Sequence, residues 1–193
     1  MKKVITLFIV AFLIIGCKDN STKDDDHGVH QTTDEQTDLS KKKVLSPHTS
    51  TMATIGDAHI HIDYSSPGVR DRIIFGGLLA YDQVWQSGAH MATWIETNKD
   101  LEIEGKTLPA GKYGFFTIPS KDDWTVMFNS NWNQHGKDEY DEKDDVLRFK
   151  VKPTISDNIT EHLEYHVTKI NDDEGAISLT WEKVSIRFNF KVK

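Results

Sequence analysis

The sequence predicts an all-β fold, a two-sheet antiparallel β-sandwich, and three observations support this class. Apolar and polar residues alternate with a period of two along much of the chain after residue 50. Long amphipathic helical patterns are missing, and turn residues recur between the alternating segments. The 193 residues include one cysteine, Cys17, so no intramolecular disulfide can form and a hydrophobic core must stabilise the domain.

The N-terminus has the pattern of a secretion signal. A basic start precedes an apolar block from Val4 to Ile15, which is shorter than the roughly 20 residues of a membrane-spanning helix. The block ends at Gly16-Cys17, a small residue before a thiol, and this pattern resembles the cleavage box of bacterial lipoproteins. We therefore expect residues 1–16 to be a cleaved signal peptide and Cys17 to carry lipid, including palmitate. A buried free cysteine in a short helix is the alternative.

Residues 17–50 are polar and charged and contain few residues that could be buried. We expect a disordered acidic tether whose root-mean-square span is about 30 Å. Lys18, where an aspartate would favour the inner membrane, predicts the outer membrane of a Gram-negative bacterium. The run KDDD beginning at Lys23 resembles surface-export tags, but a solvated linker explains it as well, so the periplasmic and exposed sides both stay open.

The net charge limits the classes of macromolecule that the protein can bind. Removal of the signal peptide takes away Lys2 and Lys3 and leaves 21 basic against 30 acidic side chains, a net charge of −9 with histidines neutral. Such a surface repels polyanions, which excludes nucleic acid as a partner. Contact with a membrane would depend on the N-terminal lipid rather than on side-chain charge.

Residues 51–193 have the size of a single domain. Alternation is clearest at residues 184–192, where Val, Ile and Phe alternate with Ser, Arg, Asn and Lys. The segments 177–181 and 163–167 alternate in the same way, and the polar residues of 170–175 supply a turn between them. These segments predict an antiparallel meander.

Further strands are expected upstream. Residues 147–151 alternate, and 124–128 form a short apolar strand. Residues 101–119, LEIEGKTLPAGKYGFFTIP, suggest strand, turn and strand, with Pro109 preset for the turn. The LPAGKY corner resembles those of transthyretin-like sandwiches, and a jelly roll is the other candidate. Only residues 76–87 have helical spacing and predict a short helix or a wound loop.

Several ordered blocks together resemble one bacterial family. They are IDYSSPGVRDRIIFGGLLAYDQVWQSGAHMATWIE, IEGKTLPAGKYGFFTIP and WTVMFN, and the resemblance extends from about residue 53 onward. The family is the domain of unknown function DUF2911, and the resemblance implies an exported protein or lipoprotein without an established activity. Ser66, Gln86 and His90 depart from the family pattern, in which arginine is usual at the first two positions and asparagine at the third. The resemblance implies that the chemistry of any polar site shared by the family there is changed or lost in this chain.

Two groups of strand histidines are weak metal candidates. His59, His61 and Asp63 alternate with apolar residues, so all three project from one face of a strand. Imidazole and carboxylate groups can bind zinc, but this spacing needs a further ligand from elsewhere, and we favour an ordinary solvated strand face. His162 and His166 repeat the arrangement.

The segment 129–145 combines aromatic, amide and imidazole side chains. Trp132 and its neighbours could stack on a sugar ring or on an apolar surface while amide groups hydrogen-bond the ligand. The acidic end of this loop offers oxygen ligands for calcium but lacks the spacing of a dedicated loop, so we expect solvated charge there.

Signatures of catalysis are missing from the sequence. There is no nucleophile elbow, Walker loop, dinucleotide-binding glycine motif or cysteine pair. Ser87 and His90 are close in the chain, but nothing identifies an orienting acid or an oxyanion hole. We therefore favour a module without catalysis.

The sequence thus favours a binding module for a glycan, a peptide or an envelope protein. The expected contacts are Arg72, Trp85, His90, Asn129, Trp132, His135 and Tyr140. The first alternative is a metal-binding protein or metal-dependent hydrolase that holds zinc through His90, His135 and a strand histidine. The second is a structural envelope component with no small ligand.

Overall fold

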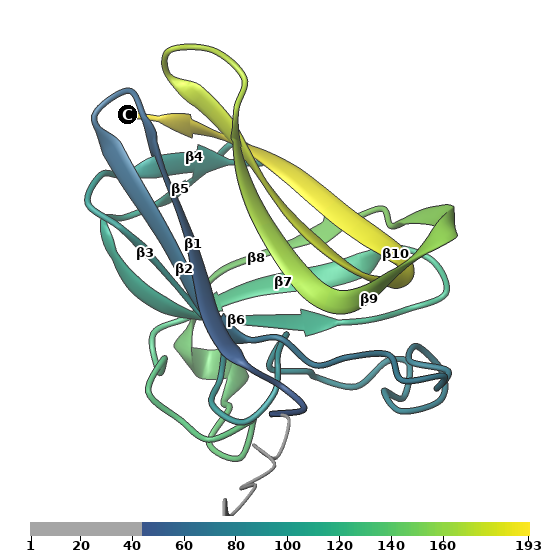
Figure 1. Ribbon diagram of the computed structural model, residues 1–193. Helices are drawn as coiled ribbons and strands as arrows, with labels where there is room; N and C mark the ends of the chain where they lie inside the picture. Colours follow the sequence, from purple (N-terminus) through teal and green to yellow (C-terminus); the bar gives the residue numbers. More distant parts are fainter. Residues whose placement is uncertain (1–43) are drawn as a thin grey trace, which may run out of the picture. The chain divides into compact units, whose positions relative to one another are not determined.

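The computed structural model describes residues 44–193 (Figure 1). The expected signal peptide, Cys17 and most of the tether lie outside these residues. The segment Lys42–Lys193 is a compact unit that contains the whole core described below. No helix in the described part of the chain is both long and apolar enough to cross a membrane.

The architecture is a two-sheet antiparallel sandwich, which confirms the predicted fold class. The first sheet has the strand order β1 (His48–Ile55), β2 (Ala58–Ser65), β3 (Trp94–Thr97), β6 (Gly111–Ile118), β7 (Trp124–Asn129) and β8 (Asp145–Val151). The second has the order β5 (Lys106–Leu108), β4 (Leu101–Ile103), β10 (Glu174–Val192) and β9 (Thr154–Lys169). All neighbouring strands run antiparallel. A short 3-10 helix, η1 (Glu142–Asp144), precedes β8.

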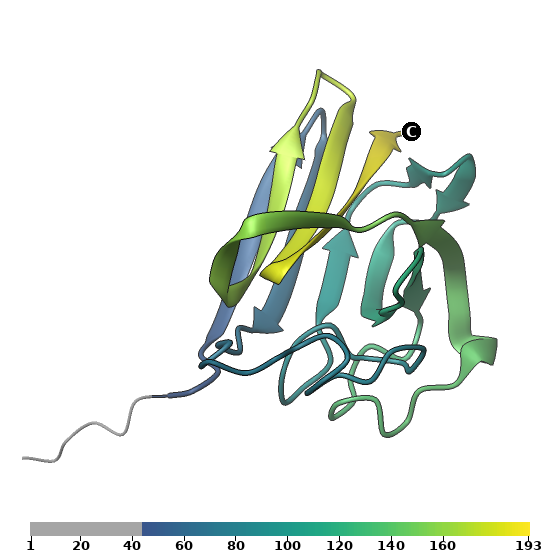
Figure 2. The ribbon, with the colours of Figure 1, turned by 90° about the vertical axis from the view of Figure 1, so that its right-hand side faces the viewer.

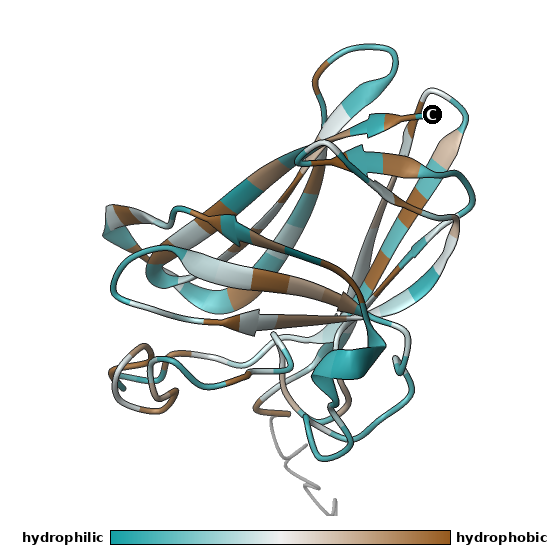
Figure 3. Cartoon of the chain, turned by 180° about the vertical axis from the view of Figure 1, so that it is seen from behind, coloured by the Kyte–Doolittle hydropathy of each residue, from teal (hydrophilic) through white to brown (hydrophobic). Residues whose placement is uncertain are grey.

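The expected C-terminal meander is a long hairpin. The predicted strands 177–181 and 184–192 are one strand, β10, whose register against β9 shifts on both sides of Glu182. Glu182 has a φ of 56°, so this bulge sharpens the twist of the hairpin without ending the strand. Apolar and polar residues alternate along β10 and along β9 from Leu163 onward (Figure 3), whereas the first half of β9 is mostly exposed.

Two apolar clusters explain the strand patterns. The main core lies between the sheets and includes Phe115, Phe128 and Trp181. A smaller cluster, which includes Phe116 and Met127, lies on the outer face of the six-stranded sheet beneath the loops. Because β6 and β7 are covered on both faces, their sequences are nearly continuously apolar and do not alternate.

The irregular segments 66–93 and 130–144 gather at one end of the sandwich (Figures 1 and 2). A backbone hydrogen bond of 2.7 Å from Gly136 N–H to the His90 carbonyl joins them. Residues 76–87 form turns and two isolated bridges, so the wound loop is present and the helix is not. This end of the molecule carries most of the residues expected to bind a ligand.

Candidate functional site

The outer face of β2 carries the polar side chains that alternation predicted. His59, His61 and Asp63 face away from the core, whereas the intervening Ile60 and Ile62 are buried. In the antiparallel register, Asp63 lies opposite Trp94 of β3 and His61 lies opposite Glu96. This register places an aromatic ring beside the polar row on the same face of the sheet.

Trp94 and Trp132 hold the ammonium group of Lys112 between them. The nitrogen of Lys112 lies 3.3 Å from the centroid of the Trp94 ring and 3.7 Å from that of Trp132. The two ring centroids are 6.3 Å apart at an interplanar angle of 67°. A cation over an aromatic face contributes about 0.5–1 kcal/mol at a surface site, so Lys112 helps to fix both rings.

Gly114 lets the loop after β7 approach the sheet. It pairs with Trp94 across β3 and β6, and a Cβ atom there would lie 3.2 Å from the Trp132 Cα atom and from the Asn131 carbonyl oxygen. It would also lie 2.7 Å from Cε2 of Phe116. The missing side chain therefore allows Trp132 to reach Trp94 from a distant part of the sequence.

Asn129 and Tyr140 shape the same loop from within. The Asn129 amide donates to the Asp141 carbonyl at 3.0 Å and to the Asp145 carboxylate at 2.9 Å, and its oxygen accepts from Asn131 N–H at 2.9 Å. The Tyr140 hydroxyl donates to Asp145 at 2.8 Å. Burial raises the pKa of Tyr140, as does its bond to Asp145, so the hydroxyl stays protonated. Both side chains therefore stabilise the loop, and neither lines the pocket described next.

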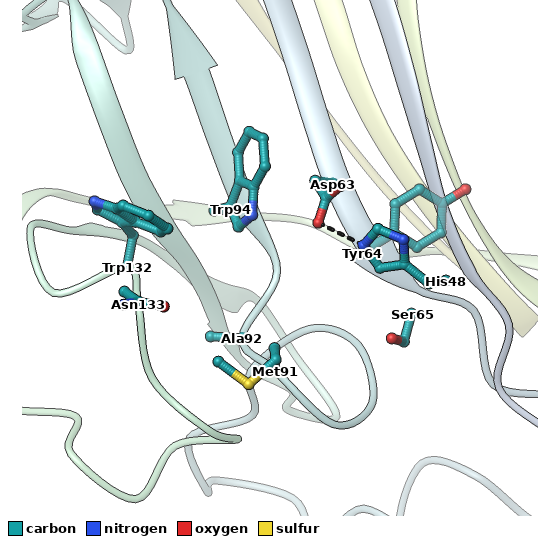
Figure 4. Close-up of a pocket in the computed structure, with 9 residues that line it drawn as sticks. All are labelled: His48, Asp63, Tyr64, Ser65, Met91, Ala92, Trp94, Trp132 and Asn133. Carbon is teal, nitrogen blue, oxygen red and sulfur yellow. Dashed lines mark hydrogen bonds and ion pairs between the residues drawn. The ribbon is translucent and has the colours of Figure 1, made fainter.

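A cavity of about 160 Å³ lies beside the tryptophan pair (Figure 4). We call it the tryptophan pocket, and its lining residues are His48, Asp63, Tyr64, Ser65, Met91, Ala92, Trp94, Trp132 and Asn133. Trp132 and Trp94 lie on one side, and Asp63, His48 and Ser65 lie on the other. The His48 imidazole and the Asp63 carboxylate are 2.9 Å apart. The pocket thus combines aromatic walls with hydrogen-bonding groups.

Three other expected contacts line a separate cavity. Arg72, Trp85 and His90 border a space of about 320 Å³ at the same end of the sandwich. We call this space the arginine cavity, and Trp132 is not among its lining residues. The residues expected to form one surface therefore divide between two cavities.

The corner 85–93 is held in place from several directions. Trp85 exchanges backbone hydrogen bonds with Thr117 of β6, and its indole N–H donates to the Gly88 carbonyl at 3.0 Å. The Ser87 carbonyl accepts hydroxyl hydrogen bonds from Tyr165 at 2.6 Å and from Thr93 at 3.0 Å. Because these bonds are buried, the corner is rigid before any ligand arrives.

His90 lies in this corner and outside β3. β3 begins at Trp94, and His90 has a φ of 62°. His90 is exposed and lies beyond the regular strand, so it points independently of Trp94.

The histidines of the described residues 44–193 do not converge on a metal site. His135 is exposed and lies 3.3 Å from Asp138 of its own loop. Residues 44–193 contain no group of three His, Cys, Asp or Glu side chains arranged to hold a metal ion. His59, His61 and Asp63 therefore share a strand face, and His48 beside Asp63 does not complete a metal site with them.

The most prominent residue at the tryptophan pocket that the sequence did not identify is Lys112. Its position depends on the pairing of β3 with β6, and no local pattern reveals that pairing. Trp94 did leave a signal, because it occupies the polar phase of a short strand, where a tryptophan needs either a covering loop or a ligand. The sequence also did not identify His48, because the domain was expected to start at residue 51. In the structure β1 already begins at His48.

Comparison with known proteins identifies a family and no relative of known activity. The family model described as a protein of unknown function, DUF2911, matches residues 46–190. No curated protein and no solved structure matches the chain. The comparisons therefore assign no reaction or ligand.

Proposed function

The chain belongs to the DUF2911 family, and we propose that it is a non-catalytic binding module that recognises a glycan at the tryptophan pocket. The observation that carries the proposal is the pair Trp94 and Trp132, two half-buried rings that line a cavity together with Asp63 and Ser65. The C–H face of a sugar ring packs on aromatic surface, while its hydroxyl groups need hydrogen-bond partners. The pocket supplies both kinds of contact.

The pocket is also preorganised for a ligand. Lys112 fixes the two rings. Asn129 donates to Asp145 and accepts from Asn131 N–H, and these bonds hold the base of the loop that carries Trp132. A site whose walls are already ordered loses little conformational entropy when a ligand binds. This order favours a binding role and requires no catalytic group.

The experiment is a titration of the chain starting at Lys18, which contains the whole compact unit, against cell-envelope glycans and peptides. Trp132→Ala is expected to weaken glycan binding about tenfold or more, because it removes one aromatic wall. His135→Ala is the matched control, since His135 is exposed in the same loop and does not line the pocket. Unchanged glycan binding by Trp132→Ala would exclude this pocket as the glycan site. Selective binding of peptides would show that the ligand is a peptide and not a glycan.

The setting of this module is the envelope, where Cys17 would anchor it by lipid to the outer membrane. The support is the pattern of the first residues, with the single cysteine after a small residue. Metabolic labelling with a palmitate analogue is expected to mark the chain, and Cys17→Ser should abolish both labelling and recovery in the membrane fraction. Protease treatment of intact cells distinguishes the periplasmic from the exposed side. A Cys17→Ser chain that stays labelled would disprove the anchor.

A further inference from the structure

The arginine cavity is basic, although the protein is acidic. Arg70, Arg72 and His90 line it, and no Asp or Glu is among its lining residues within the part of the chain described. The chain as a whole has a net charge of −7. Glu161 lies nearby, but its carboxylate accepts the backbone N–H of Arg70 at 3.0 Å and does not border the cavity. The cavity therefore presents positive charge without an acidic residue in its wall.

Arg72 is held in a fixed orientation with donors to spare. Its Nε donates to the Val69 carbonyl at 3.0 Å and its Nη2 to the Gly68 carbonyl at 2.6 Å. A guanidinium has five N–H donors, so both Nη1 hydrogens and one Nη2 hydrogen have no part in these two bonds. Arg72 forms no ion pair with a carboxylate of residues 44–193. A held guanidinium loses little entropy when it binds a carboxylate.

Aromatic rings form another part of the wall. Trp85 and Trp181 stack with centroids 5.7 Å apart and an interplanar angle of 26°, and both line the cavity. The indole N–H of Trp85 donates to Gly88, whereas that of Trp181 is buried without an acceptor in the described structure. A buried donor without a partner is rare in folded proteins. Trp181 is 1% exposed, so this N–H lies beneath the cavity surface and is a close reporter of changes there.

The surrounding backbone is strained and firmly held. Five residues between 66 and 93 other than glycine have positive φ: Arg70, Asp71, Asp82, Ser87 and His90. Such conformations persist only where the neighbouring structure enforces them, and they concentrate at ligand sites. Arg70 and His90, at two of these positions, line the cavity themselves.

We propose that the arginine cavity, with Arg72 as the charged anchor and Trp85 and Trp181 as the apolar wall, binds a small organic carboxylate that has an aromatic or aliphatic body. The guanidinium of Arg72 binds the carboxylate, and the apolar part of the ligand packs on the indole rings and the side chains of Leu78 and Leu79. This site is distinct from the tryptophan pocket and does not depend on the function proposed for that pocket.

The test uses the ¹⁵N-labelled chain starting at Lys18 and a series of probes: benzoate, phenylacetate, 4-phenylbutyrate and the matching uncharged amides. At least one carboxylate is expected to bind and to shift the indole N–H resonance of Trp181, which Trp181→Phe identifies by removing it. Arg72→Gln should weaken that binding about 10- to 100-fold, because a charge-assisted hydrogen bond is lost. Arg70→Gln should weaken it about two- to fivefold, as expected for an exposed charge.

Two controls keep the outcomes separate. Arg72 also donates to the Val69 and Gly68 carbonyls, so Arg72→Gln removes bonds that hold the loop. If that variant does not fold, Arg70→Gln is the decisive variant, because Arg70 is exposed. Trp132→Ala alters only the tryptophan pocket and should leave carboxylate binding unchanged. The proposal is overturned if the amides bind as tightly as the carboxylates, if no carboxylate in the series shifts the Trp181 resonance, or if Arg70→Gln binds at full strength after Arg72→Gln has failed to fold.

Discussion

The Tyr165 hydroxyl donates a hydrogen bond of 2.6 Å to the Ser87 carbonyl and so joins β9 of the four-stranded sheet to the corner between β2 and β3. Tyr165→Phe removes this bond and keeps the ring in the core. We expect a loss of about 0.5–1.5 kcal/mol in the free energy of unfolding, because Thr93 still donates to the same carbonyl. Urea unfolding monitored by tryptophan fluorescence measures it. A loss above about 3 kcal/mol would mean that the carbonyl is left without a partner.

Alkaline pH should destabilise the protein through its buried tyrosines. Burial raises the pKa of both Tyr165 and Tyr140 above the ordinary value of 10.0. In the unfolded chain these hydroxyls ionise near pH 10, whereas in the folded chain they keep their protons to higher pH. The free energy of unfolding therefore falls as pH rises above about 10, by up to about 1.4 kcal/mol per pH unit for Tyr165.

The measurement is a set of urea unfolding curves between about pH 8 and about pH 11. Tyr165→Phe should show a shallower decline than the native chain, because one of the linked protons is gone. An equal decline in both proteins would assign the effect to other groups.

Gly114→Ala should displace the loop that carries Trp132. The added methyl group would meet Phe116, Asn131 and Trp132, two of them through backbone atoms that cannot rotate away. We expect a cost of about 1–3 kcal/mol in the free energy of unfolding and a change in the environment of Trp132. Thermal unfolding and indole N–H chemical shifts report these two effects.

Gly105→Asn is a suitable control for that substitution. Gly105 has a φ of 71° in the turn between β4 and β5, and a Cβ there has no neighbour within 4 Å. Asparagine tolerates positive φ, so this change should cost little. If both variants lost equal stability, the close approach at Gly114 would not be the cause.

Lys112→Met should loosen the tryptophan pair while keeping a side chain of similar length. Loss of the cation between the rings is expected to cost about 0.5–1 kcal/mol and to broaden the indole signals of Trp94 and Trp132. Lys183→Met is the matched control, since Lys183 is exposed on β10, away from the pocket. Indole signals that stay sharp in Lys112→Met would show that the loop alone orders the rings.

Alternation revealed most of the strands because half-buried strands expose one face. The pattern Val184 to Val192 lies in a strand as expected, and the predicted turn at Pro109 precedes β6. The segment LEIEGKTL, expected as one strand, is a hairpin of β4 and β5 with a second turn at Glu104-Gly105. The bulge at Glu182 left no local signal, because its two flanking segments alternate like separate strands. The wound loop 76–87 mimicked helical spacing because Tyr81 and Trp85 pack against the main core and Val84 against the smaller cluster. Leu78, the fourth residue of that pattern, is exposed.

The candidate contacts were identified by residue type, but their grouping was not. Trp132 lies at a pocket and Arg72, Trp85 and His90 lie at another cavity, while Asn129 and Tyr140 are used within their own loop. Which residues share a cavity depends on strand pairing across long stretches of sequence, as for Trp94 with Gly114. The amino-acid composition of a loop does not reveal which strand residues pair with one another.

The place of β10 has a consequence for the order of assembly. It lies between β4 and β9, and its residue Val192 pairs with Leu101. The four-stranded sheet therefore cannot close until the chain has been made through the end of β10, whereas the six-stranded sheet needs no residue beyond Val151. Such late, distant pairing favours slow folding, and it suits a protein that folds after synthesis rather than during it.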